Sequence, residues 1–155
     1  MKISVQTADF DAGFEMKNIS KSNSIGAVAS FIGLVRDVND GDAISGMTLE
    51  HYPGMTERAI GKIVDEAKSR WQVMDCTVIH RYGALKPNDQ IVLVAVASAH
   101  RGDAFDACEF IMDYLKTQAP FWKKEHREGG ACWVEAKAAD DSAAERWQDP
   151  KRKAG

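Results

Sequence analysis

Hydrophobic residues recur at helical spacing in two long segments of the chain. Residues 56–71 combine an apolar stripe with charged positions, which predicts an amphipathic helix that Thr56 caps at its start. Its buried side is expected to consist of Ile60, Ile63, Val64, Ala67 and Trp71. A second helix is predicted to begin at Gly102-Asp103, with Asp103 as its cap, and to end before Pro120. Its inner stripe is expected to consist of Phe105, Cys108, Ile111, Met112 and Leu115.

Other segments have the composition or the alternation of β-strands. Small and β-branched residues in 25–35 predict a largely buried strand, and the apolar run 90–99 predicts a central strand covered on both faces. Gly26 and Gly33 indicate a bulge or a close backbone approach. Further strands are predicted at 3–6, 44–52 and 74–82, with a hairpin at 121–127 and 131–136.

The remaining segments connect these elements. Short helices are predicted within 9–20, with Phe10, Phe14 and Ile19 facing inward, and within 140–147. Residues 37–42 are predicted to form a mobile loop, and 86–89 a turn. The pattern as a whole predicts an α+β fold, with a mixed, mainly antiparallel sheet and two principal helices.

Length and charge narrow the class of protein. The 155 residues predict a single domain over 1–148, followed by a flexible basic tail at 149–155. The net charge of -3 argues against nucleic acid as the main partner. The first residues lack the pattern of a signal peptide, and no apolar run is long enough for a membrane helix, so we expect a soluble, cytoplasmic protein. Cys76, Cys108 and Cys132 form no Cys-x-x-Cys pair and are expected to be buried free thiols.

The strand-to-helix turn at His100 and Arg101 is a candidate anion site. A strand that ends in His-Arg and turns through Gly102 places two cationic side chains beside a helix N-terminus, where free N–H groups also favour an anion. A solvated loop is the alternative interpretation.

More cationic residues lie at other element ends. Arg36 ends a predicted strand, Lys116 lies in the last turn of the second helix, and Lys123 and Lys124 follow Phe121-Trp122. Helix-dipole complementarity alone explains Lys116, and an exposed hairpin explains Lys123 and Lys124. Their convergence at element ends favours a site for an anionic small molecule.

Other chemistries find little support. His51, His80 and His126 lack metal-ligand spacing, so each is interpreted as a surface or hydrogen-bonded core histidine. Ser98 lacks a Gly-x-Ser-x-Gly context, and neither a P-loop nor a dinucleotide fingerprint is present. Neither a metal nor a nucleotide cofactor is implied.

Five linked motifs between about residues 25 and 147 resemble the large, catalytic subunit of molybdopterin synthase. The motifs are Gly33-Leu34-Val35-Arg36, Leu49-Glu50-His51-Tyr52-Pro53-Gly54-Met55, Val78-Ile79-His80-Arg81, Ser98-Ala99-His100-Arg101, and Tyr114-Leu115-Lys116-Thr117 through Ala119-Pro120-Phe121-Trp122-Lys123-Lys124. The resemblance implies an α/β-hammerhead-like α+β fold.

The resemblance also implies a reaction and its partners. The reaction is sulfur transfer from the thiocarboxylated Gly-Gly C-terminus of a small ubiquitin-like carrier subunit to cyclic pyranopterin monophosphate, which forms the dithiolene of molybdopterin. The implied assembly is a homodimer within a heterotetramer. The implied catalytic residues are Lys116, Lys123 and His100. The implied substrate-binding residues are Leu34, Val35, Arg36, His100, Arg101, Lys116, Lys123, Lys124 and Glu125. Leu34 stands where related sequences often carry a lysine, so a side-chain charge is not expected there.

The length of the second helix adds a hypothesis. Asp103 and Lys116 are thirteen residues apart, or about 20 Å along a helix, too far for one small pterin to touch both ends. The site would then be composite, with Arg36, Lys116 and Lys123 from one subunit and His100 and Arg101 from its dimer partner. Two competing hypotheses are a non-catalytic module that binds a ubiquitin-like tail and a phosphate-ester hydrolase that uses His100.

Overall fold

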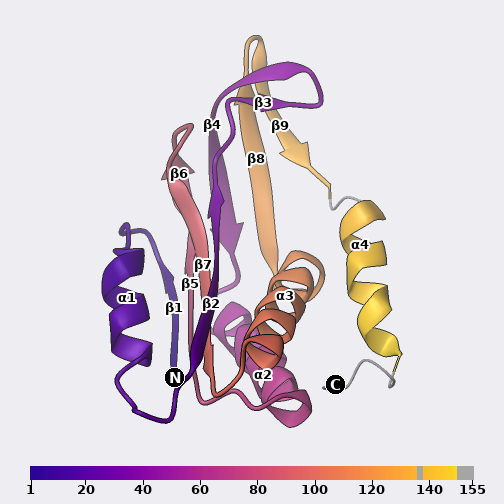
Figure 1. Cartoon of the computed structure of the whole chain (residues 1–155). Coiled ribbons are helices and arrows are strands. Elements are labelled where there is room, and N and C mark those ends of the chain that lie inside the picture. The colour runs from indigo at the N-terminus through magenta and orange to yellow at the C-terminus, as the bar shows by residue number, and fades with distance from the viewer. Residues whose placement is uncertain (136–137, 150–155) are drawn as a thin grey trace.

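The described part of the chain contains two β-sheets, one of which has helices packed on it (Figure 1). The structure, a computed structural model, describes residues 1–135 and 138–149. The first sheet has the strand order β1 (Lys2–Gln6), β5 (Asp75–Arg81), β7 (Gln90–Ser98) and β2 (Ala27–Leu34). Only β1 and β5 run parallel within it, so the sheet is mixed and mainly antiparallel, as predicted.

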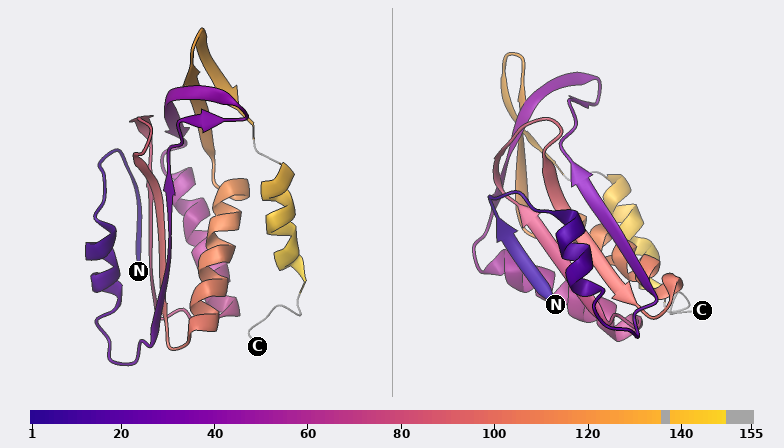
Figure 2. Two further views of the ribbon diagram at one scale, coloured as in Figure 1. Left: turned by 45° about the horizontal axis from the view of Figure 1, so that its top comes forward. Right: turned by 60° about the vertical axis from the view of Figure 1, so that its left-hand side comes forward.

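Helices cover both faces of the first sheet. Helix α1 (Ala12–Ile19) lies on one face, while α2 (Met55–Arg70) and α3 (Arg101–Gln118) lie on the other (Figures 1 and 2). The central position of β7 is confirmed, because it pairs with β5 and β2 and most of its side chains are buried. No helix within the described residues is both long and apolar enough to cross a membrane.

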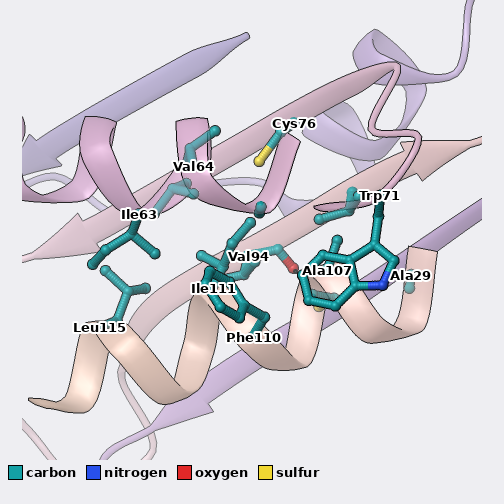
Figure 3. Close-up of a cluster of buried hydrophobic side chains, with 14 of the residues drawn as sticks. Ala29, Ile63, Val64, Trp71, Cys76, Val94, Ala107, Phe110, Ile111 and Leu115 are labelled. Atoms are coloured by element: carbon teal, nitrogen blue, oxygen red, sulfur yellow. Dashed lines mark hydrogen bonds between the residues drawn. The ribbon is translucent and has the colours of Figure 1, made fainter. Parts of the chain in front are cut away.

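The main hydrophobic core lies between the sheet and the pair α2 and α3 (Figure 3). The predicted inner side of α2 is confirmed at all five positions. Trp71, at the end of α2, packs edge-on against Phe110 of α3 at 5.3 Å between ring centroids. Trp147, in the 3-10 helix η1 (Arg146–Gln148) that follows α4 (Ala138–Glu145), contacts both rings. The core therefore joins the end of the described chain to its two longest helices.

Two aromatic residues that were expected to face inward are exposed. Phe105 of α3 is 64% exposed, and the inner side of that helix uses Ala104, Ala107 and Phe110 in addition to three of the predicted residues. Phe14 is 58% exposed because Phe10 precedes the helix α1, so a helical spacing counted from Phe10 does not apply to Phe14.

Strand β2 is also more exposed than the sequence predicted. Among the described residues it pairs only with β7 and forms one edge of the sheet, while α3 packs against it from one side. Phe31, Ile32 and Leu34 are consequently exposed in the single chain. The two glycines were interpreted correctly, since the ladder shifts register after Gly33 and a Cβ at Gly26 would lie 2.3 Å from the carbonyl oxygen of Ala99.

Both long helices begin differently from the prediction. Gly54, with φ of +81°, is the N-cap of α2, and its N–H donates to Glu57. Thr56 is buried instead, with its hydroxyl bonded to Tyr52. Helix α3 has His100 as its N-cap, and Asp103 accepts a hydrogen bond from the backbone N–H of Gln72.

The second sheet extends beyond the first and contains the order β3 (Val38–Asn39), β4 (Asp42–His51), β8 (Phe121–Arg127) and β9 (Gly130–Val134) (Figure 1). The short strand β6 (Gly83–Leu85) also pairs with β4. The hairpin of β8 and β9 is confirmed. The predicted loop at 37–42 instead contains β3 and a tight turn at Asp40 and Gly41, whose φ angles are 51° and 86°. Positive φ at two successive residues is the geometry that a two-residue hairpin turn requires.

Candidate active site

Strand β8 supplies the central residues of the candidate site. Side chains alternate along a strand, so Phe121, Lys123 and Glu125 project from one face of β8. Lys123 is paired with Leu49 and Glu125 with Met47 of the neighbouring strand β4. Glu125 is 2% exposed, and a carboxylate buried to this extent needs hydrogen-bonding partners.

Three residues satisfy the Glu125 carboxylate. The Nδ2 of Asn39 donates to its Oε1 at 2.8 Å, and the Nη2 of Arg127 donates to its Oε2 at 2.8 Å. The ammonium of Lys123 lies 3.8 Å from Oε1. The hydrogen bond to Glu125 raises the pKa of Arg127, which also pairs with Asp42. The carboxylate is therefore the centre of a charged network.

Arg36 joins this network through Asn39. Its Nη2 donates to the Oδ1 of Asn39 at 3.1 Å, while the same amide donates to Glu125. Arg36 and Lys123, both predicted from the sequence as site residues, are thus linked through two intervening side chains. Asn39 and Arg127 were not predicted from the sequence. The Asp40-Gly41 pair could have indicated a tight turn between two strands. Asn39, which precedes the turn, would then lie on a strand with a defined side-chain direction.

Lys116 and His80 lie near the start of the same strand. His80 is buried, its ring stacks on Phe121 with a centroid distance of 3.7 Å, and its Nδ1 lies 2.9 Å from the carbonyl oxygen of Arg81. A carbonyl can only accept, so Nδ1 carries the hydrogen. The pKa of His80 is lowered to about 4, mainly by burial and to a smaller extent by the charge of Lys116. The charge of Lys116 therefore has an uncharged imidazole as its neighbour, near the end of the site where Phe121 lies.

His100 and Arg101 lie at the other end of α3. Both are exposed, and Arg101 precedes Lys116 by fifteen residues, or about 22 Å along the helix. In Figure 1 the start of α3 points away from the second sheet, and the end of α3 points toward it. Within one chain, the structure brings Arg36, Lys123 and Glu125 together, and it leaves His100 and Arg101 far from Lys116.

The other predicted binding residues have different surroundings. Leu34 is exposed, whereas Val35 is buried and its N–H donates to the carbonyl of Asp89. Lys124 projects from the opposite face of β8, with its ammonium 5.4 Å from the centre of the Trp133 ring. Lys124 is therefore placed differently from Lys123.

The cysteines differ in exposure. Cys76 and Cys108 are buried, and burial raises the pKa of both thiols to about 12. Cys132 is exposed on β9, so the prediction that all three are buried is wrong for this residue. Strand β9 lies at the edge of the second sheet, and its residues from Gly130 to Trp133 are all exposed. Within 1–135 and 138–149, no three His, Cys, Asp or Glu side chains gather as metal ligands would.

Comparison with known proteins identifies the family of this chain. The family described as MoaE protein matches residues 5–118. The chain belongs to this family. It is 62% identical over 146 residues to the molybdopterin synthase catalytic subunit of Ralstonia nicotianae, covering 94% of this chain and 83% of that protein. Family membership and such relatives show the general function, that of a catalytic subunit for molybdopterin synthesis in molybdenum cofactor biosynthesis.

Solved structures of this family share the fold. The molybdopterin biosynthesis MoaE protein from Burkholderia ambifaria is 52% identical, with a TM-score of 0.81, covering 96% of this chain and 98% of that one. Molybdopterin synthase from Staphylococcus aureus is 31% identical, with a TM-score of 0.79, covering 84% of this chain and 95% of that one. The α+β architecture is therefore that of the MoaE family.

Proposed function

We propose that the chain transfers sulfur from the thiocarboxylated C-terminus of a small ubiquitin-like carrier subunit to cyclic pyranopterin monophosphate. The product would be the dithiolene of molybdopterin. The observation that carries the proposal is the linked set of Arg36, Asn39, Glu125 and Lys123, which connects two cations through a buried carboxylate of the second sheet.

The charges of the two reactants explain why such a site needs cations. A thiocarboxylate and a phosphate are both anionic, and bringing them together in a partly desolvated pocket costs several kcal/mol without compensating charge. A guanidinium can grip a phosphate with two parallel hydrogen bonds, a role that suits Arg36 and Arg101. The Glu125 carboxylate holds the ammonium of Lys123 in the site. Because this carboxylate is buried, its negative charge is not exposed to the substrate.

Lysine residues suit the proton transfers of the reaction. The thiocarboxylate sulfur attacks a side-chain carbon of the pterin and forms a C–S bond as a C–O bond at that carbon breaks. The departing oxygen takes up a proton, and the carrier is joined to the pterin through sulfur. Water then hydrolyses the bond between the carrier's carbonyl carbon and that sulfur, which releases the carrier as a carboxylate and leaves the sulfur on the pterin. Lys116 or Lys123 would transfer protons in these steps, with Lys116 nearest the carrier's terminal carbonyl. Because the neighbouring His80 is uncharged, its imidazole does not repel the ammonium of Lys116.

The assembly that we propose is a homodimer that binds two carrier subunits. In this assembly His100 and Arg101 of one subunit would complete the site that Arg36, Lys116 and Lys123 of the other begin. The separation of these groups along α3 supports the proposal. The exposed apolar side chains of the edge strand β2 are consistent with burial against another chain.

The decisive experiment combines the chain with a thiocarboxylated carrier and cyclic pyranopterin monophosphate and measures the dithiolene product by chromatography. We expect product with the wild type and with a Lys17→Ala control on α1, and we expect loss of product with Lys116→Ala at unchanged affinity for the carrier. Unchanged product in Lys116→Ala would contradict its catalytic role and favour a binding module. Turnover of a phosphate ester without any carrier would instead favour the hydrolase.

A further inference from the structure

Asn39 occupies a position that connects two charged groups of opposite sign. It is buried on β3, between the exposed Arg36 and the buried Glu125. Its Oδ1 accepts from Arg36 at 3.1 Å and its Nδ2 donates to Glu125 at 2.8 Å. The tight turn at Asp40-Gly41 pairs Asn39 with Asp42 and thereby sets the direction of its side chain.

The chemistry of the two neighbours fixes the direction of this amide. A guanidinium only donates, so the Asn39 oxygen must face Arg36. An ionised carboxylate only accepts, so the Asn39 nitrogen must face Glu125. Among side chains of this length, a neutral carboxamide alone provides an acceptor and a donor without a charge of its own. Aspartate has the same shape but lacks the donor, and leucine has neither group.

We propose that Asn39 is a positioning residue, which sets the place of Arg36 and, through Glu125, of Lys123 in the candidate site. This inference rests on the proposed function for its catalytic consequence, but the positional claim is independent of it. Asn39 itself need not contact either substrate. Its effect would pass through the hydrogen bonds of its amide to Arg36 and Glu125.

The surroundings define how an aspartate at this position would behave. The charged or titratable groups that face the Asn39–Glu125 contact are Arg36, Lys123 and Arg127, with Asp42 on β4 and Cys132 opposite Glu125 on β9. In Asn39→Asp two carboxylates would meet where the amide now donates, and such a pair retains one proton to higher pH than a single carboxyl group. That proton can replace the amide hydrogen and restore the donor to Glu125.

A spectroscopic measurement tests the positional claim without any assay of activity. The side-chain nitrogen signals of Arg36 are recorded by NMR in wild type, in Asn39→Leu and in an Asn23→Asp control at an exposed loop position. We expect slow rotation of the Arg36 guanidinium in wild type and control, and faster rotation in Asn39→Leu. An Arg36 signal that is unchanged in folded Asn39→Leu overturns the proposal, whatever the protein's activity.

An activity measurement then tests the catalytic consequence. Displacing catalytic groups by about 1 Å can cost about 100-fold in rate, so Asn39→Leu is expected to lose activity by about this factor at every pH. Asn39→Asp is expected to be weakest at alkaline pH, with its activity relative to wild type rising by up to about tenfold per unit as the pH falls. Asn23→Asp should follow the wild-type profile throughout.

The outcomes separate this inference from the proposed function. If wild type forms no dithiolene, the proposed function fails, and the NMR comparison still decides whether Asn39 positions Arg36. If wild type is active and Asn39→Leu is equally active, the positioning role is overturned. A constant loss in Asn39→Asp at all pH values also overturns it, because a shared proton would then have no effect. Aspartate differs little in size from asparagine, so this variant remains informative if Asn39→Leu fails to fold.

Discussion

Single residues in this protein acquire their properties from burial rather than from the neighbouring sequence. His80 was interpreted from its lack of metal-ligand spacing as a surface or core histidine, and the structure places it in the core against Phe121. Neither its tautomer nor its lowered pKa can be read from the order of residues, because both depend on groups from other elements. The same holds for Cys132, whose exposure, shared with its neighbours on β9, depends on whether another element covers that strand.

The buried His80 predicts that stability falls in acid. Its folded-state pKa of about 4 lies below the ordinary value of 6.5, so the unfolded chain binds a proton more readily. The free energy of unfolding therefore has its full value above about pH 6.5 and decreases as the pH falls toward 4. The loss should be on the order of 3 kcal/mol.

Urea unfolding of wild type and His80→Gln at pH 7.5 and pH 4 measures this effect. Glutamine keeps a donor and does not titrate in this range, so the variant should lose less stability between the two pH values than wild type does. Equal losses in both proteins would show that His80 does not account for the dependence.

The exposure of Cys132 predicts selective labelling by a maleimide. Native protein should take up one label, because Cys76 and Cys108 are buried and their thiols stay protonated at neutral pH. Mass spectrometry should locate the label on Cys132, and Cys132→Ser should remain unlabelled until it is unfolded. Rapid labelling of Cys76 or Cys108 in the native protein would contradict the structure.

The helices and strands show where the spacing of apolar residues predicts burial correctly and where it does not. All five positions predicted for the inner side of α2 are buried, because the apolar spacing of this helix is regular from Ile60 onward. Helix α3 was less regular, and its small residues Ala104 and Ala107 face the core while the larger Phe105 does not. The burial of β2 was overestimated because an apolar sequence does not reveal whether a strand lies at the centre or at the edge of a sheet.

Two phenylalanines of α3 provide a matched test of this distinction. Phe110→Ala should reduce the free energy of unfolding by about 3–5 kcal/mol, because it removes a buried ring that packs against Trp71 and Trp147. Phe105→Ala, at an exposed position of the same helix, should change it by at most about 0.5 kcal/mol. Chemical denaturation of both variants measures the two values, and similar losses would mean that the inner side of α3 is assigned incorrectly.

The whole molecule explains why the candidate site could be predicted only in part. The cationic residues at element ends were recognisable in the sequence, and three of the predicted residues, Arg36, Lys123 and Glu125, belong to one network. The connection between them depends on Asn39, which is 86 positions from Glu125 and whose role requires the pairing of β3, β4 and β8. No local pattern reports such a pairing.

The distance between the two ends of α3 predicts complementation between inactive chains. A mixture of Arg101→Ala and Lys116→Ala subunits, dissociated and reassociated, should regain activity if each site takes residues from both subunits. Random pairing gives about half mixed dimers, each with one intact site. About a quarter of wild-type activity is therefore expected. Each variant alone serves as the control, and mixed dimers without activity would contradict the composite site.

The turn at Asp40 and Gly41 limits how the length of this segment can vary. The turn and the two-residue strand β3 before it form a short connection between Arg36 and β4, with no spare residues to absorb a change of length. Inserting one residue between Arg36 and the turn would shift the alternation of the strand and direct the residue at position 39 away from Glu125. Loop segments usually tolerate changes of length, but here a single inserted or deleted residue should be as damaging as replacing Asn39 itself.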